Sequence, residues 1–126
     1  MHIFTYGSLM FSEVWQRVVP GSHASVPARL PGYRRSAIRG VSYPGIAADD
    51  SAQVDGRLYL DVAAEDLAAL DRFEGGEYAR VAVSVVLEDG ARFEAQAYVY
   101  LYPDKLTGAV WDPGHFDCAH FLRFEA

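Results

Sequence analysis

Residues 70–80, with the sequence LDRFEGGEYAR, join a predicted helix to a predicted strand. Before this stretch, apolar residues recur at helical spacing up to Phe73, and the two glycines that follow Glu74 can end a helix. After it, residues 80–87, RVAVSVVL, are rich in the β-branched side chains that favour strands. We therefore expect Glu74 to lie at a helix-to-strand corner.

Glu74 is a candidate acid/base because aromatic residues flank it. The rings of Phe73 and Tyr78 would place its carboxyl beside apolar surface, which disfavours the charged form and raises the pKa. A glutamate tuned in this way can carry a proton near neutral pH. The alternative is a solvated glutamate at the C-terminal end of a helix, mildly disfavoured by the helix dipole. Taken by itself, the stretch favours this solvated alternative.

Length and composition indicate one domain in a reducing compartment. The 126 residues suffice for one hydrophobic core, so a single domain is predicted over residues 1–126. The one cysteine, Cys118, excludes an internal disulfide, and the N-terminus lacks the pattern of an export signal. No apolar run approaches the roughly 20 residues that a membrane-spanning helix needs. We expect a cytoplasmic protein with no membrane partner.

The charge balance argues against nucleic acid as a partner. The net charge is −6 and the isoelectric point is near 5.0, whereas non-specific nucleic-acid binders carry a basic excess. Arginines do gather between Arg29 and Arg39, close to Tyr33 and Tyr43. In an acidic chain we interpret them as a solvated strand face, with one arginine holding an anionic substrate as the alternative.

The N-terminal region predicts a small anion-binding loop. A short buried strand is expected at residues 2–6, followed by a turn at 7–10 and a helix with an apolar face from Phe11 to Val18. Free backbone N–H groups at the start of such a helix can bind an anion. The turn lacks the lysine and the glycine spacing of a P-loop, so a substrate carboxylate suits it as well as a phosphate. An ordinary strand-to-helix connection is the alternative.

The rest of the chain predicts a sheet-rich α+β fold. Prolines and glycines over residues 26–46 predict short strands broken by turns, and residues 53–60 alternate like a strand before Asp61, a plausible helix cap. Residues 80–100 predict a hairpin turning at a Glu-Asp-Gly sequence, and Asp117 is expected to cap a last helix. So many short strands with three short helices indicate a small mixed sheet closed like a barrel.

Little in the sequence indicates a metal site, a cofactor or a catalytic nucleophile. The four histidines have no recognised ligand spacing, so no metal and no cofactor is predicted. His115, Cys118 and His120 are interpreted as faces of a terminal helix. Ser8 follows a strand but lacks the G-x-S-x-G pattern of a nucleophile elbow. Hydrolysis through Ser8 or Cys118 remains a third hypothesis, which an electrophilic probe would test.

Two motifs in combination resemble the gamma-glutamylcyclotransferase-like superfamily. The first is Tyr6-Gly7-Ser8-Leu9, and the second is residues 71–75, DRFEG, followed by a tyrosine and an arginine. The nearest branch is that of the short AIG2-like and gamma-glutamylamine cyclotransferase proteins. The resemblance covers nearly the whole chain, and it implies a small mixed fold with a barrel-like sheet and a cavity.

The resemblance also implies a reaction and a set of site residues. The loop formed by Tyr6, Gly7, Ser8 and Leu9 would hold the gamma-glutamyl group of a small-molecule substrate, and Glu74 would be the acid/base. The substrate's own α-amine attacks its γ-carbonyl, which gives 5-oxoproline and a free amine. Such an acyltransferase-type cyclisation needs no protein nucleophile, metal or cofactor.

At positions 8–10 this chain differs from two groups of members of that superfamily. Leu9 stands where glutathione-cycle members have Asn, and Ser8 and Met10 stand where gamma-glutamylamine members have Thr and Lys. Neither group's substrate is therefore implied. Tyr100, on the return strand of the hairpin, either faces the cavity and binds substrate or packs in the core. A binding module without turnover is the alternative to an enzyme, and the oligomeric state is not predicted.

Overall fold

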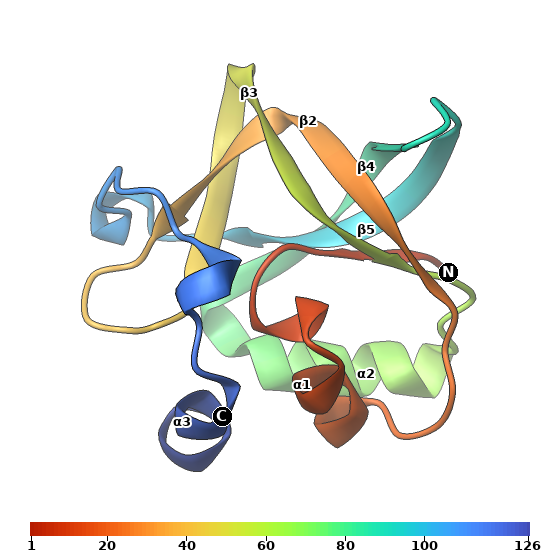
Figure 1. Cartoon of the computed structure of the whole chain (residues 1–126), viewed down its shortest axis with the longest axis horizontal. Coiled ribbons are helices and arrows are strands. Elements are labelled where there is room, and N and C mark those ends of the chain that lie inside the picture. The colour runs from red at the N-terminus through yellow and green to blue at the C-terminus, as the bar shows by residue number, and fades with distance from the viewer.

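The computed structural model describes residues 1–126 and contains five β-strands that close into a barrel in the order β1-β3-β2-β4-β5. The strands span Ile3–Thr5 (β1), Ser25–Ala37 (β2), Pro44–Tyr59 (β3), Tyr78–Leu87 (β4) and Arg92–Tyr100 (β5). The neighbouring pairs are antiparallel except β1 and β5, which are parallel and place Ile3 opposite Gln96. The predicted α+β class with a closed, barrel-like sheet is confirmed (Figure 1).

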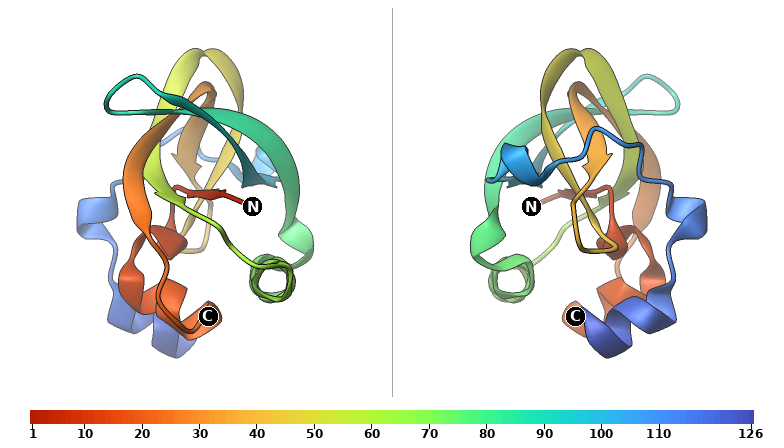
Figure 2. Two further views of the ribbon diagram at one scale, coloured as in Figure 1. Left: turned by 90° about the vertical axis from the view of Figure 1, so that its right-hand side faces the viewer. Right: turned by 90° about the vertical axis from the view of Figure 1, so that its left-hand side faces the viewer.

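Three α-helices gather at one end of this barrel (Figures 1 and 2). They span Ser12–Val18 (α1), Ala64–Glu74 (α2) and Cys118–Phe124 (α3). Short 3-10 turns lie at Ser8–Met10 (η1), Gly75–Glu77 (η2), Pro103–Lys105 (η3) and Pro113–His115 (η4). None of the helices is long and apolar enough to cross a membrane.

Two buried apolar clusters hold the fold together. One fills the barrel interior and includes Phe4, Leu30, Leu58 and Val85. The other lies between the barrel and the helices, where Trp15 stacks on Tyr59 with ring centroids 3.6 Å apart. Burying side chains of this size contributes about 1.5–3 kcal/mol each. The helices are thus fastened to one end of the sheet by packing rather than by intrinsic helix stability.

The corner and the hairpin form as the sequence predicts. Helix α2 ends at Glu74, and Gly75 follows with a φ of 71°, a left-handed conformation that suits glycine. Strands β4 and β5 pair over their length, and Gly90 has a φ of 88° in the turn between them. Asp117 caps α3, because its carboxylate accepts a hydrogen bond from the backbone N–H of His120.

The prediction of short strands broken by turns over residues 26–46 is confirmed only between Ala37 and Pro44, where β2 ends and β3 begins, and is wrong for residues 26–37. Strand β2 runs without interruption through Pro27 and Pro31, and one irregularity between Pro31 and Tyr33 absorbs Gly32 at a φ of 86°. Strand β2 pairs with β4 only at Ala28 and Arg29, so most of that side is an edge. Edges and bulges are the places where a strand accepts proline.

The predicted cap at Asp61 is also wrong. Helix α2 begins at Ala64, and its N-cap residue Ala63 makes no side-chain cap hydrogen bond. Asp61 instead has a φ of 54°, in a turn that leads Val62 back under the sheet. There the N–H of Val62 donates to the carbonyl oxygen of Met1 at 2.7 Å. Burial of Val62 therefore decides the conformation of this turn.

Candidate active site

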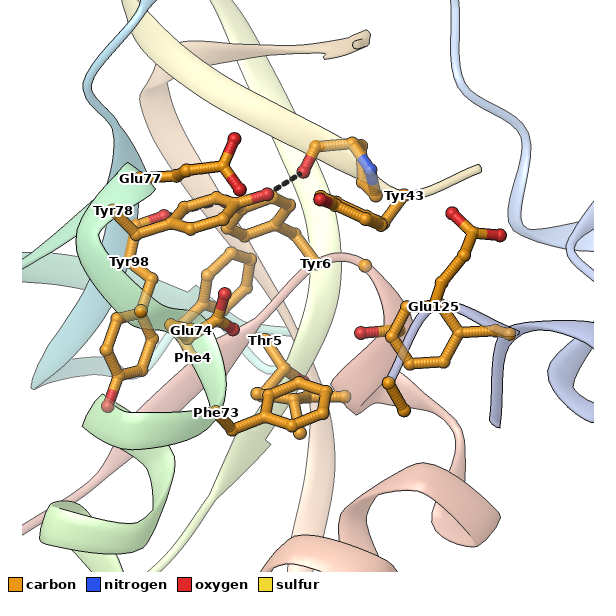
Figure 3. A pocket seen from close by; sticks show the side chains of 17 residues that line it. Phe4, Thr5, Tyr6, Tyr43, Phe73, Glu74, Glu77, Tyr78, Tyr98 and Glu125 are labelled. Carbon is orange, nitrogen blue, oxygen red and sulfur yellow. Dashed lines mark hydrogen bonds between the residues drawn. The ribbon is translucent and has the colours of Figure 1, made fainter. Parts of the chain in front are cut away.

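A cavity of about 280 Å³ opens where the loop after β1 meets the C-terminal end of α2. Its walls come from residues 4–9, from Tyr43 and Pro44 at the start of β3, from residues 73–78 and from the end of α3 (Figure 3). Small-molecule sites commonly have volumes of roughly 300–1000 Å³, so this one suits a small ligand. The two motifs singled out in the sequence thus lie on opposite walls of one cavity.

The loop of Tyr6 to Leu9 is held by contacts from distant strands. The Tyr6 hydroxyl donates to the carbonyl oxygen of Tyr98 at 2.6 Å, and Arg35 Nη1 donates to the carbonyl oxygen of Tyr6 at 2.8 Å. Gly7 lies so close to Pro44 that a Cβ there would be 2.8 Å from Pro44 Cδ. The loop can therefore keep its shape before any ligand arrives.

The backbone of this loop has hydrogen-bond donors that its 3-10 turn leaves without a partner. Ser8 and Leu9 begin the 3-10 turn η1, and the first N–H groups of such a turn have no partner within it. Met10 is the first residue whose N–H bonds back, to the carbonyl oxygen of Gly7 at 3.0 Å. Tyr6, Gly7, Ser8 and Leu9 all line the cavity.

Glu74 lies opposite this loop as the last residue of α2. Its carboxyl is half-buried among Phe4, Phe73 and Tyr78, and burial raises its pKa to about 8. Burial is the sole cause of that shift, since neither a hydrogen bond nor a neighbouring cation offsets it. The solvated glutamate that the sequence favoured is therefore not what the structure contains. A carboxyl of this kind can exchange a proton near pH 8.

Asp71, one turn earlier on α2, fastens the helix end that carries Glu74. Its carboxylate accepts from the hydroxyl of Tyr98 at 2.7 Å and from Arg80 Nε at 2.9 Å. Although burial acts to raise it, the pKa of this carboxyl lies below the usual range because of those two donors. Arg80 Nη1 also donates to the Gln96 side chain at 3.0 Å. The network ties α2 to strands β4 and β5.

Tyrosine rings form much of the remaining wall. The hydroxyl of Tyr78 donates to the carbonyl oxygen of Pro44 at 2.9 Å, drawn as a dashed line in Figure 3. Burial, and after it the charge of Glu74, raises the pKa of Tyr6 well above its usual value. Burial likewise raises the pKa of Tyr78 and of Tyr98. These phenols remain protonated, so they act as hydrogen-bond donors and apolar surface.

Tyr100 does not line the cavity, which corrects the expectation that it faces the substrate. Its buried ring packs behind Tyr78 with ring centroids 5.3 Å apart, so core packing is the alternative that the structure realises. The backbone of Gly45 packs directly against Tyr100, because a Cβ on Gly45 would be 2.7 Å from Tyr100 Cβ. The hydroxyl of Tyr100 is buried without a hydrogen-bond partner.

The candidate nucleophiles lack partners in the cavity. Ser8 lines it, but no histidine does, so Ser8 has no imidazole base there. Cys118 begins α3 away from the cavity, and burial raises the pKa of its thiol, which opposes thiolate formation. No group of three or more His, Cys, Asp and Glu side chains is positioned to hold a metal ion.

Sequence reasoning missed several lining residues. Tyr43, Glu77, Tyr98 and Glu125 all contribute side chains to the cavity. Glu77 follows Glu74 by three residues, a spacing that could have suggested a shared face had the helix been expected to continue as a 3-10 turn. The other three are distant in sequence, and no local pattern marks them.

Comparison with known proteins agrees with the fold and the motifs. A family model described as gamma-glutamyl cyclotransferase, AIG2-like, matches residues 3–116. The chain is 34% identical over 129 residues to AIG2-like protein D of Arabidopsis thaliana, covering 98% of this chain and 84% of that protein. The solution structure of another Arabidopsis thaliana protein has a TM-score of 0.78 at 31% identity, covering 98% of this chain and 76% of that one. A structure described as gamma-glutamyl cyclotransferase shares the fold, with a TM-score of 0.70 at 22% identity over 79% of this chain and 66% of that one.

Proposed function

This chain belongs to the gamma-glutamyl cyclotransferase, AIG2-like family, and we propose that it cyclises a gamma-glutamyl amine or amide to 5-oxoproline and a free amine. One observation carries the proposal: the Glu74 carboxyl faces a small cavity without a protein partner, with its pKa raised to about 8. A site that only bound an anionic ligand would gain nothing from a carboxyl in that place. A proton carrier needs such a pKa.

The proposed reaction is intramolecular, so the protein has only to position the substrate, carry a proton and stabilise the oxyanion. The α-amine nitrogen of the substrate attacks the γ-carbonyl carbon, a new C–N bond closes the five-membered ring, and the C–N bond to the leaving amine breaks. The proton lost by the attacking nitrogen passes to Glu74 and then to the departing nitrogen, so atoms and charges balance. Holding amine and carbonyl together supplies much of the rate by proximity.

The loop opposite Glu74 is proposed to bind the gamma-glutamyl group. Backbone N–H groups of Ser8 and Leu9, free within their turn, would stabilise the oxyanion that forms on the γ-carbonyl, and such donors are worth about 3–4 kcal/mol in acyl transfer. Tyr6 and Gly7 supply the rest of the loop wall. On this proposal the partner is a small molecule, and the reaction takes place in the cytoplasm, the reducing compartment that a lone cysteine favours.

The decisive experiment compares the native chain with Glu74→Gln on a panel of gamma-glutamyl amines, amides and isopeptides. Glutamine keeps the size and hydrogen bonding of the side chain but cannot carry the proton, so 5-oxoproline release should fall about 10²–10⁴-fold. Glu88→Gln, in the exposed hairpin turn, is the matched control and should retain native rates. Retained turnover in Glu74→Gln would remove its proposed role. If nothing turns over but a gamma-glutamyl ligand raises the melting temperature of both forms, the chain is a binding module.

The pH dependence of the rate provides a second test. Glu74 must be ionised to take the proton, and its pKa is about 8. We expect kcat/KM to rise about tenfold per pH unit below that value and to level off above it. A profile with its acidic limb near 4.5, the ordinary glutamate value, would show that Glu74 is not the titrating group.

A further inference from the structure

Arg35 contacts the loop of residues 6–9 from outside the cavity. Its Nη1 donates to the carbonyl oxygen of Tyr6 at 2.8 Å and to that of Asp55 at 3.2 Å. Arg35 is not among the side chains that form the cavity wall (Figure 3), so it does not meet a ligand there directly. Any effect of this arginine on the site therefore passes through the backbone of the loop.

The guanidinium of Arg35 keeps its charge without an ion pair. Arg34, the preceding residue, pairs with Asp49 at 2.8 Å, whereas Arg35 forms no such pair. The side chain of Arg35 is half-buried, and burial lowers its pKa, although the charges of Asp55 and Asp112 act in the opposite direction. Arginine stays protonated in proteins, so a positive charge persists here. Keeping it half-buried costs free energy that an ion pair would offset, so packing alone does not explain it.

Trp111 fixes the position of this guanidinium. Arg35 Cζ lies over the Trp111 ring, 5.2 Å from its centroid. The ring is 7% exposed, and its Nε1 donates to the carbonyl oxygen of Ser42 at 2.7 Å, which orients it. A guanidinium stacked on a buried aromatic ring keeps its charge but loses conformational freedom. The charge therefore has a defined place beside the Tyr6 carbonyl.

The peptide between Tyr6 and Gly7 connects Arg35 to the cavity. Because this peptide is planar and trans, the N–H of Gly7 points away from the carbonyl that Arg35 binds. That N–H makes no hydrogen bond within the protein, and Gly7 lines the cavity. A charged donor on the carbonyl polarises the amide and strengthens its N–H as a donor. Burial first, and then Glu74, raise the pKa of the Tyr6 phenol, whereas the charge of Arg35 acts to lower it, so its field reaches the cavity wall.

Resting on the proposed function, we infer that Arg35 is a positioning residue that strengthens the Gly7 N–H, through the Tyr6–Gly7 peptide, as a donor to the oxyanion on the γ-carbonyl. Arg35 itself touches neither the substrate nor the reacting atoms. The γ-carbonyl oxygen is neutral in the bound substrate and becomes negative as the α-amine adds, so a stronger donor acts mainly in the transition state. Loss of the charge should therefore lower kcat rather than raise KM.

The test separates charge from hydrogen bonding at position 35, with the conjugate of the gamma-glutamyl panel that the native chain turns over fastest. Arg35→Gln keeps a donor for the Tyr6 carbonyl without the charge, so kcat should fall about tenfold while KM changes less than about twofold. Arg35→Lys keeps the charge and should lose less than about threefold in kcat. Arg34→Gln, on the same strand but 57% exposed and paired with Asp49, is the matched control and should keep native kinetics.

Chemical rescue separates the charge from the shape of the side chain. In Arg35→Ala, guanidinium chloride below denaturing concentrations should restore kcat several-fold, whereas urea, a neutral molecule of similar shape, should not. Rescue by both compounds, equal losses in Arg35→Gln and Arg35→Lys, or a change in KM alone would overturn the inference, because Arg35 would then only maintain the shape of the loop. If Arg35→Ala does not fold, the glutamine and lysine variants decide.

The amide proton of Gly7, followed by NMR, tests the inference without turnover. Loss of polarisation should move its resonance upfield in Arg35→Gln and leave it near the native position in Arg35→Lys and in Arg34→Gln. If no conjugate of the panel releases 5-oxoproline, the proposed function fails for that panel, and this resonance decides: the upfield shift supports the effect of Arg35 on Gly7, and an unmoved resonance overturns it. If 5-oxoproline forms but neither the resonance nor kcat changes in Arg35→Gln, only the inference fails.

Discussion

The barrel interior and the cavity at its end lie close together, but their side chains differ in polarity and in how they are solvated. In the interior, Leu30, Leu58 and Val85 are each at most 1% exposed and belong to the buried hydrophobic cluster of the barrel. In the cavity, Glu74 gives up solvation without gaining a partner. Apolar packing thus stabilises the fold. The cavity instead keeps a desolvated carboxyl, which lowers stability but lets that carboxyl exchange a proton near neutral pH. Substitutions in the two regions should therefore affect stability with opposite signs.

The largest expected effect comes from filling space in the barrel wall. A Cβ on Gly56 would overlap the carbonyl oxygen of Thr5 and come 2.6 Å from Phe4 Cζ. Because strand β1 cannot move away without opening the barrel, we expect Gly56→Ala to lower the free energy of unfolding by about 3 kcal/mol or more. Chemical denaturation measures this loss.

Gly76, at the rim of the cavity, is the matched control. A Cβ there meets nothing within 4 Å, and its backbone needs no left-handed conformation. Gly76→Ala should change the unfolding free energy by less than about 0.5 kcal/mol. Equal costs at the two glycines would mean that the barrel wall is no more tightly packed than the rim.

A smaller effect of opposite sign is expected at Glu74. In the folded chain its pKa is about 8, above the ordinary 4.5, so the folded state keeps a proton that the unfolded state loses. Its contribution to stability is present below pH 4.5 and is lost as the pH rises through 8. Glu74→Gln avoids this loss. The variant should be more stable than the native chain by about 2 kcal/mol at pH 9, after allowance for partial exposure to the cavity.

Thermal or urea unfolding between pH 5 and 9 tests this expectation. The advantage of Glu74→Gln over the native chain should grow with pH, whereas Glu88→Gln should differ from it by a constant amount. A flat difference for Glu74→Gln would mean that the carboxyl is already ionised and solvated in the folded chain.

The smallest effect is expected where the cavity wall is fastened to the barrel. Asp71→Asn keeps an acceptor for the Tyr98 hydroxyl but removes the charge that pairs with Arg80. Because Asp71 is 44% exposed, we expect a loss of only about 1 kcal/mol at pH 7, shrinking as the native carboxylate becomes protonated in acid. The same loss should lower the melting temperature by about 3–5 °C, and a displaced helix end should also lower kcat several-fold. A variant with unchanged kcat would show that Glu74 keeps its position without this network.

Local patterns in the sequence determined the helix that ends at Glu74, the hairpin of β4 and β5 and the loop of residues 6–9. Each of these depends on side-chain period, glycine placement or turn chemistry within about ten residues, where backbone geometry is decided locally. The same reasoning failed for β2, because prolines that usually break a strand are tolerated where β2 is an edge of the sheet. It also failed at Asp61, because burial of Val62 overrides the capping preference of the aspartate.

Only the tertiary structure decided how the cavity is completed. Closure of the barrel places Ile3 beside Gln96, and the same closure brings the Tyr6 hydroxyl to the carbonyl of Tyr98. Glu125 reaches Ser42 across 83 residues of chain. Such contacts follow from strand register and chain closure rather than from local propensity, so no short stretch of sequence records them. The sequence therefore determined which residue can carry a proton, and the fold decided which charges and rings surround it.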